Sequence, residues 1–134
     1  MKIIACVGDG YGLMFNSRRV STDRAVIRHI LDMTEGSEIM CSEYSSELFP
    51  AQSVKVVNDI EKATAADGYY FLEDQDATAV ISQAQELIVY YWNRKYPYDR
   101  KLPIEDFCKR LKKISQGEFK GNSHDIITWE VYCL

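Results

Sequence analysis

Short apolar runs alternate with polar and glycine-containing segments along this chain. Residues 2–7 form the first run and predict a short buried strand. A glycine-containing loop over residues 8–15 follows and ends in an apolar cluster. Apolar side chains then recur three and four residues apart over about residues 26–33, which predicts one face of a helix. Ser21 or Thr22 would cap this helix at its N-terminus.

The same alternation continues to the end of the chain. We expect strands at residues 38–41, 54–57, 69–72, 87–92, 112–120 and 124–133. Between them we expect a helix turn at 42–49, helices at 60–66 and 77–85, a polar loop at 93–103, and a helical or irregular segment at 105–111. The last two strands flank a turn at Gly121 and Asn122, so they would form an antiparallel hairpin at one edge of the sheet. The pattern therefore predicts an α/β fold in a single domain spanning residues 1–134.

Length and composition restrict the class of protein further. The chain has 134 residues, of which 46% are apolar and 27% charged, and these values are typical of one globular domain. The apolar run at the N-terminus is too short for a signal peptide, and no run approaches the roughly 18 residues of a membrane span. The four cysteines show no CxxC spacing, which favours a reducing compartment. We expect a cytoplasmic protein that does not contact membranes.

Charge is distributed unevenly along the chain, although the net charge is only −4. Residues 1–31 carry five cations and two anions, and residues 94–134 carry nine cations and six anions. Residues 32–93 carry two cations and twelve anions. If the two ends meet in space, a basic face would form opposite an acidic one. The simpler interpretation is a solvated surface with uneven charge.

Several catalytic motifs are missing from the sequence. Gly8 and Gly10 follow the first strand, but Leu13 occupies the third glycine position of the dinucleotide fingerprint. No Gly-Lys-Ser/Thr sequence is present, which excludes a Walker phosphate loop. The two histidines, His29 and His124, lack a second His or Cys at metal-ligand spacing. A Ser-His-Asp triad stays open on the sequence, although no nucleophile elbow is found.

Asp23 is the most informative single residue. It lies three and four residues before Val26 and Ile27, so it projects toward the apolar side of the expected helix. One interpretation is a carboxylate that favours the helix dipole. The other is a partly desolvated carboxylate that binds or protonates a ligand. Both interpretations stay open.

A second candidate site lies in the aromatic and basic segment of residues 90–101. Rings that stack on bases and cations that pair with phosphates are typical of proteins that bind single-stranded RNA. The candidate residues for this site are Arg94, Lys95, Tyr96, Tyr98, Arg100 and Lys101. The alternative is that residues 90–92 face the two sides of a sheet while the cations merely solvate a loop.

The order of elements and several local strings resemble the dihydrofolate reductase family over nearly the whole chain. The opening strand and the loop that reaches Gly-Leu-Met-Phe-Asn at residue 16 are similar to that family's first strand and mobile active-site loop. Asp23 stands where the family's pocket carboxylate opens the first helix. Further similar stretches lie at residues 39–49, 84–91, 99–103 and 122–132. The resemblance implies a mostly parallel mixed sheet with a C-terminal antiparallel hairpin, flanked by helices.

The chain departs from that family at the places where the family holds its cofactor. Residues 71–74 read Phe-Leu-Glu-Asp where the family has a Gly-Gly pair, and residues 41–44 read Cys-Ser-Glu-Tyr where it has a phosphate-binding Gly-Arg-x-Thr. These carboxylates would repel a pyrophosphate. The chain is also shorter than typical members, mainly in its middle, so one cofactor-side strand is expected to be missing or truncated. The NADPH site is therefore expected to be lost, and no cofactor is expected.

Three functions remain open after these observations. The first is a protein with this fold that is not a reductase and that binds a small molecule in a pocket around Asp23, Tyr11, Met14, Ile27 and Tyr90. The second is an RNA-binding or RNA-processing protein that uses the segment of residues 90–101. The third is a homodimer that associates through exposed aromatic side chains of residues 90–98. Whether the protein is an enzyme is left open.

Overall fold

The computed structural model describes residues 1–65 and 67–134, and the elements in this part of the chain alternate as the sequence predicts. The strands are β1 (Lys2–Val7), β2 (Gly12–Phe15), β3 (Arg18–Arg19), β4 (Ile39–Cys41), β5 (Val54–Val56), β6 (Tyr69–Leu72), β7 (Glu86–Tyr91), β8 (Arg100–Lys101), β9 (Lys112–Phe119) and β10 (Ile127–Cys133). The α-helices are α1 (Arg24–Met33), α2 (Glu43–Ser46) and α3 (Ile104–Cys108), and short 3-10 turns are η1 (Ala51–Ser53), η2 (Ile60–Ala63) and η3 (Ile81–Gln83).

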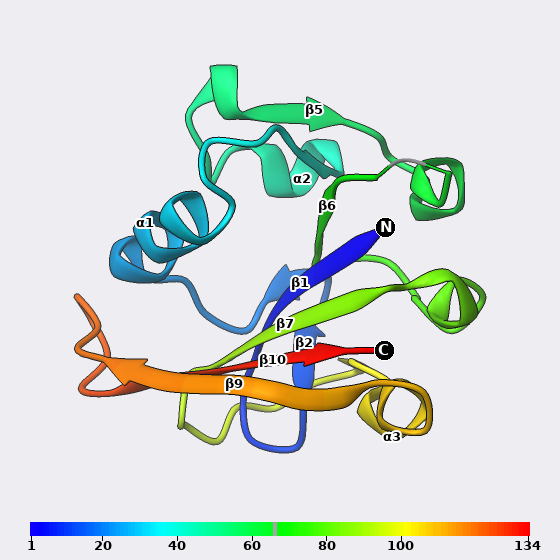
Figure 1. Cartoon of the computed structure of the whole chain (residues 1–134). Helices are drawn as coiled ribbons and strands as arrows, with labels where there is room; N and C mark the ends of the chain where they lie inside the picture. Colours follow the sequence, from blue (N-terminus) through cyan, green and yellow to red (C-terminus); the bar gives the residue numbers. More distant parts are fainter. Residues whose placement is uncertain (66) are drawn as a thin grey trace.

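The main sheet of the described residues has seven strands in the order β5-β4-β6-β1-β7-β10-β9 (Figure 1). β1 lies between β6 and β7 and runs parallel to both, and β4 and β5 continue the parallel part. β10 is antiparallel to β7 and to β9. The prediction of a mostly parallel mixed sheet with a C-terminal antiparallel hairpin is therefore confirmed.

β1 is buried on both faces, as a central parallel strand must be. Ile4 faces a layer that contains Val26 and Ile30 of α1. Ile3 faces the opposite layer, which contains Phe107 of α3. Each of these five side chains is at most 1% exposed. The continuous apolar run of β1, rather than an alternating one, thus reflects helical cover on both sides.

A second sheet in the order β3-β2-β8 corrects two predictions of the sequence analysis. The sequence predicts loops at residues 8–15 and 93–103, whereas β2 and β8 lie within them and pair with each other. Leu13 of β2 is only 3% exposed, because the small sheet packs against the core. Gly12 permits the close approach of Tyr98, since a Cβ at position 12 would lie 2.5 Å from the Tyr98 Cβ.

The middle of the chain forms less helix than the sequence predicts. The segment at residues 42–49 contains the single turn of α2, as predicted, whereas the described part of residues 60–66 contains only η2, with position 66 outside the described residues. The prediction of a helix at residues 77–85 is wrong, because only η3 forms there. The buried side chains of this stretch still recur at helical spacing, at Ala77, Val80, Ile81 and Ala84. The apolar side chains of this segment are therefore buried although its backbone does not form an α-helix.

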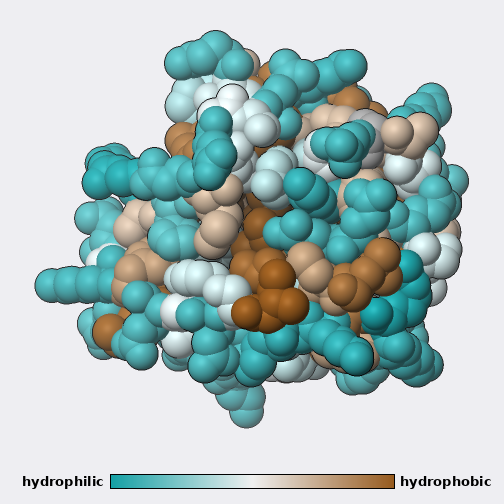
Figure 2. All heavy atoms as spheres, in the orientation of Figure 1, coloured by the Kyte–Doolittle hydropathy of each residue, from teal (hydrophilic) through white to brown (hydrophobic). Residues whose placement is uncertain are grey.

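Figure 2 shows a face of the molecule that is largely hydrophilic, with some hydrophobic residues near its centre. These residues do not form one dominant apolar patch on that face. The large apolar side chains that are exposed come from different segments, namely Phe15, Val56, Tyr98, Ile114, Ile126 and Leu134. Single exposed apolar residues are normal for globular proteins. Among the helices that the structure describes, none is both long enough and apolar enough to cross a membrane.

The C-terminal hairpin depends on one close approach that can be tested. Gly117 of β9 lies opposite Trp129 of β10, and a Cβ at position 117 would lie 2.6 Å from Trp129 Cζ2. Gly117→Ala should lower the free energy of unfolding by about 1–3 kcal/mol, because the indole would have to move out of its packed position. Gly68→Ala is the matched control, since a Cβ there would meet only Met40 Cε at 3.4 Å. Urea denaturation of both variants checks the prediction, and equal losses would contradict it.

Candidate functional site

Asp23 is the N-cap of α1, which corrects the prediction that Ser21 or Thr22 takes this position. Its backbone is extended (φ −155°, ψ 130°), and its Oδ1 accepts a hydrogen bond of 2.8 Å from the backbone N–H of Ala25. A carboxylate at this position satisfies a helix donor and interacts favourably with the helix dipole. Asp23 is 3% exposed, so it also lies on the buried side of the helix, as the sequence predicts.

The connection between β9 and β10 supplies the remaining hydrogen bonds to the Asp23 carboxylate. The backbone N–H of Asn122 donates to Oδ1 at 2.9 Å, and the backbone N–H of Ser123 donates to Oδ2 at 2.8 Å. The Ser123 hydroxyl donates to Oδ2 at 3.2 Å, and His124 Nδ1 lies 2.9 Å from the same oxygen. Burial alone would raise the pKa of the Asp23 carboxyl, but these hydrogen bonds hold the pKa well below its usual range. The carboxylate therefore stays ionised at neutral pH.

The loop approaches Asp23 closely because residue 121 is glycine. A Cβ at Gly121 would lie 2.8 Å from Asp23 Oδ2 and 2.6 Å from the carbonyl oxygen of His124. No side chain can occupy that space while both hydrogen-bonded groups keep their positions. The turn that the sequence predicts at this place is thus also the contact that closes the loop over α1.

His124 extends the hydrogen-bonded group beyond Asp23. Its Nε2 lies 3.0 Å from Ser21 Oγ and 3.3 Å from the Tyr96 hydroxyl. The imidazole stacks on the indole of Trp92, with ring centroids 4.7 Å apart and an interplanar angle of 25°. His124 is 5% exposed. The connection between β3 and α1 and the connection between β7 and β8 therefore converge on one buried histidine.

Two adjacent pockets lie against this end of α1. One has a volume of about 300 Å³ and is lined by Asp23, Ile27 and four neighbours, Thr22, Arg24, Asn122 and Ser123. The other has a volume of about 290 Å³ and is lined by the cations Arg24, Arg28 and Lys120, together with Ala25, Gly121 and Asn122. Arg24 and Asn122 belong to both, so the two hollows are neighbours. The basic ends of the chain do meet here in space.

The structure does not bring all predicted pocket residues together. Asp23 and Ile27 line one pocket, whereas Met14 lines another of about 730 Å³ together with Asn16, Ser17, Tyr44, Asp74, Asp99 and Arg100. Tyr90 is fully buried, and its hydroxyl lies 2.8 Å from His29 Nδ1. Tyr90 packs in the core with Val26 and Ile30 of α1, so the prediction that it lines the pocket is wrong.

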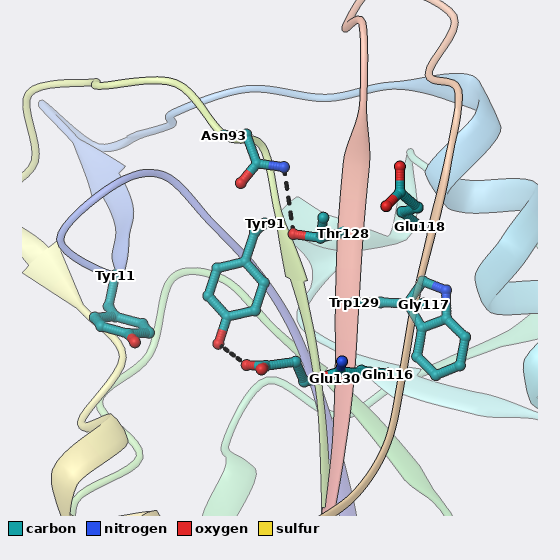
Figure 3. Close-up of a pocket in the computed structure, with 9 residues that line it drawn as sticks. All are labelled: Tyr11, Tyr91, Asn93, Gln116, Gly117, Glu118, Thr128, Trp129 and Glu130. Carbon is teal, nitrogen blue, oxygen red and sulfur yellow. Dashed lines mark hydrogen bonds between the residues drawn. The ribbon is translucent and has the colours of Figure 1, made fainter.

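Tyr11 lines a fourth pocket, of about 520 Å³, on the face of β7, β9 and β10 (Figure 3). The carboxylate in this pocket already has protein partners: Tyr91 and Tyr132 both donate to Glu130, and Lys113 Nζ lies 3.0 Å from it. Burial opposes these interactions, but together they lower the pKa of Glu130. Because Glu130 is held in this way, we do not take this pocket as the main site.

The carboxyl ends of β4 and β6 carry a second group of buried charges. Glu73 is 7% exposed and accepts hydrogen bonds from Arg19 Nε at 3.0 Å and Ser45 Oγ at 2.8 Å. Asp74 accepts a hydrogen bond of 2.8 Å from Ser42, the N-cap of α2. Burial raises the pKa of Glu73, and the bonds from Arg19 and Ser45 oppose this rise.

The predicted RNA-binding segment is divided between two places. Arg94 donates to the carbonyl oxygen of Ser123 at 3.2 Å and is exposed beside the β9–β10 loop, with Lys95 next to it in the chain. Tyr96 points inward to the His124 group. The remaining three predicted residues lie at the second sheet: Tyr98 covers Gly10 and Gly12, and Arg100 and Lys101 form β8.

Within residues 1–65 and 67–134, no group of three or more His, Cys, Asp or Glu side chains could hold a metal ion. The chain matches no protein-family model and no curated protein. Among solved structures, a dihydrofolate reductase from Enterococcus faecalis, complexed with NADP(H) and RAB-propyl, is similar to it, with a TM-score of 0.70 over 98% of this chain and 94% of that chain.

The protein has a dihydrofolate reductase-like fold. Sequence identity to that structure is 11%, so the likeness shows the fold alone. The resemblance seen in the sequence is confirmed at this level. Within this dihydrofolate reductase-like fold, the site residues that the sequence does not indicate include Ser21, His124 and the cations Arg24, Arg28 and Lys120. For Ser21 and His124 the sequence leaves only a Ser-His-Asp triad open, because their pairing joins positions 103 residues apart.

The role of Asp23 as a closing contact predicts a pH-dependent loss of stability. Asp23→Asn should lower the free energy of unfolding by about 2–4 kcal/mol near neutral pH, because an amide accepts fewer and weaker hydrogen bonds from the loop. The folded-state pKa is lowered, so this contribution is fully present above the unfolded pKa of about 4 and is lost as the pH falls through the folded-state value.

Urea titrations of wild type and Asp23→Asn at about pH 6 and about pH 3 check this prediction. The difference between the two proteins should shrink at the lower pH. Asp32→Asn, an exposed position on the same helix, is the matched control and should change little at either pH. A difference for Asp23→Asn that is the same at both pH values would contradict the argument.

Proposed function

We propose that this protein is not a reductase and that it binds a small anionic molecule in the two pockets at the N-terminal end of α1. The observation that carries this proposal is the lining of the second pocket, in which Arg24, Arg28 and Lys120 are gathered without an acidic residue. Cations arranged in this way are typical of sites for phosphate or carboxylate groups.

These three cations are available for a ligand. All are exposed, and within the described part of the chain none lies within 4.0 Å of a carboxylate oxygen. Asp23 lies beside them, but its oxygens already accept hydrogen bonds from its own helix and from the loop. An anion would therefore meet unpaired guanidinium and ammonium groups, with the amide of Asn122 at the boundary of both pockets.

Two carboxylates near the ends of β4 and β6 argue against NADP(H) as the ligand. The reductase with the similar fold is complexed with NADP(H). In this chain Glu73 and Asp74 follow β6 and take the hydrogen bonds of Arg19, Ser45 and Ser42. Two carboxylates at the N-terminal end of α2 do not fit a pyrophosphate, because they repel it and use the donors it would need.

Calorimetric titration with inorganic pyrophosphate, with NADPH in parallel, tests the proposed site. Pyrophosphate should bind with an affinity that falls as salt is added, and Arg28→Ala should weaken it by about 10-fold, the effect of removing one charge-assisted hydrogen bond. Lys62→Ala, an exposed cation on η2, is the control and should bind as wild type does. The proposal would be contradicted if NADPH bound more strongly than pyrophosphate and if neither variant changed the affinity for NADPH. That result would indicate a cofactor site.

RNA binding is the second candidate, and the position of Arg94 favours it. Arg94 contacts the β9–β10 loop, so it extends the basic group of Arg24, Arg28 and Lys120 along one surface. Single-stranded RNA also needs exposed rings for its bases, and of the predicted rings Tyr98 is 40% exposed whereas Tyr96 is half-buried. A small anion needs only the cations that line the pocket and no exposed rings, so it is the first proposal.

Retention of a single-stranded oligoribonucleotide at low and high salt distinguishes the RNA candidate. Arg94→Ala should reduce both the affinity and its salt dependence, because each phosphate contact releases counterions. Lys55→Ala in β5 removes an exposed cation at the far edge of the sheet and is the control. Retention that is equally weak in all three proteins would leave the small anion as the ligand.

A further inference from the structure

Ser21, His124 and Asp23 form one continuous chain of hydrogen-bonding groups at the N-terminal end of α1. His124 Nδ1 lies 2.9 Å from Asp23 Oδ2, and His124 Nε2 lies 3.0 Å from Ser21 Oγ. We propose that this chain is a catalytic centre in which the Ser21 hydroxyl is the nucleophile toward carboxylic esters. A nucleophile held by a base that a third group orients is the arrangement that such catalysis requires.

The hydrogen bonds assign a role to each member. An ionised carboxylate only accepts, so the contact with Asp23 places a proton on His124 Nδ1. In the neutral imidazole, Nε2 then carries the lone pair, and this lone pair faces the Ser21 hydroxyl. Asp23 is itself fixed by the backbone N–H groups of Asn122 and Ser123. Asp23 is therefore the positioning residue, His124 the general base and Ser21 the nucleophile.

The base is buried and packed, whereas the residue that carries the nucleophile is less buried. His124 is 5% exposed and stacks on Trp92, so its ring cannot turn away from Ser21 without leaving its packed position. Ser21 is only half-buried. The Tyr96 hydroxyl lies 3.4 Å from Ser21 Oγ and 3.3 Å from His124 Nε2, whereas Ser21 Oγ approaches the same nitrogen more closely, at 3.0 Å. Pre-organisation of this kind separates a catalytic hydroxyl from a surface serine.

The second histidine of the chain provides an internal comparison. His29 Nδ1 lies 2.8 Å from the Tyr90 hydroxyl, and its ring stacks on Phe119 at 4.6 Å. Within the described residues, no carboxylate oxygen lies within 4.0 Å of His29 and no serine is among its hydrogen-bond partners. His29 thus has the contacts of a packing residue, whereas His124 has both partners that base catalysis needs.

The proposed reaction is hydrolysis in two steps. Ser21 Oγ forms a bond to the acyl carbon while its proton passes to His124 Nε2, and the C–O bond to the alcohol breaks as His124 returns that proton to the leaving oxygen. Water then attacks the acyl carbon while its proton passes to His124 Nε2, and the bond from the acyl carbon to Ser21 Oγ breaks as His124 returns that proton to Oγ and the acid is released. The net change is ester plus water to acid plus alcohol, with no oxidation.

Labelling of the wild-type protein with a biotinylated fluorophosphonate, followed by peptide mapping, tests the inference directly. We expect one adduct, on Ser21, because the reagent reacts with activated hydroxyls and mimics the acyl step. Ser21→Ala should abolish the adduct. Ser53→Ala, a half-buried serine without a side-chain hydrogen bond in the described residues, should label as wild type does.

His124→Gln should reduce the rate of labelling at Ser21 by about 100-fold, the usual contribution of a general base. Its circular dichroism spectrum establishes that it is folded; if it is not, the map of the wild-type protein alone decides. Labelling of wild type that is no faster than labelling of Ser21→Ala, or an adduct on another residue, would overturn the proposal. These outcomes are independent of pyrophosphate binding, because labelling reports only on the hydroxyl.

Discussion

The structure depends on one buried carboxylate that joins two distant parts of the chain. Asp23 begins α1 and accepts hydrogen bonds from its own helix and from the β9–β10 loop, about 100 residues later in the sequence. An ionised group with 3% exposure is costly to bury unless nearly all its acceptor sites are used. The loop meets this condition with backbone N–H groups, and Gly121 provides the space for them. The helix end, the hairpin and the site are thus held by the same atoms.

A second buried carboxylate shows how much the kind of donor matters. The pKa of Asp23 is lowered, whereas burial raises the pKa of Glu73 in spite of its contacts with Arg19 and Ser45. Asp23 faces three backbone N–H groups and a histidine, which are fixed by the helix and the loop. Glu73 depends on the side chains of Arg19 and Ser45, and Arg19 also contacts Glu47. Fixed backbone dipoles compensate for lost water more completely than shared side chains do.

The sequence predicts the sheet well because its strands are read from local pattern. The bounds of β1 and β6 are those predicted, because a short continuous apolar run is typical of a parallel strand that is buried on both faces. The helix predicted at residues 77–85 fails for the converse reason: apolar residues at helical spacing are also satisfied by a short 3-10 turn that packs on the core. The sequence predicts a loop at residues 8–15 because one partner of β2, β8, lies far along the chain, and the other, β3, is only two residues long.

The candidate site could be predicted only in part for the same reason. Asp23 is identified by its place on the apolar side of a helix, which is a local property. Its partner His124 and the cation Lys120 come from the last connection of the sheet, and no spacing rule relates them to α1. Ile27 was found with Asp23 because both belong to one helix, whereas Tyr11 and Met14 lie at other pockets. Sequence patterns locate residues on elements, but topology decides which elements meet.

Charge and fold are coupled at this end of the molecule. The basic residues of the two chain ends would repel one another if they were only collected on a surface. Asp23 supplies the opposite charge between α1 and the loop, and its hydrogen bonds bring Lys120 within reach of Arg24 and Arg28. Because its acceptor sites are filled by backbone donors, Asp23 does not use the cations as partners. The contact between Asp23 and the loop therefore brings Arg24, Arg28 and Lys120 together and leaves them without an acidic partner among the described residues. Unpaired cations of this kind are what the proposed anion site requires.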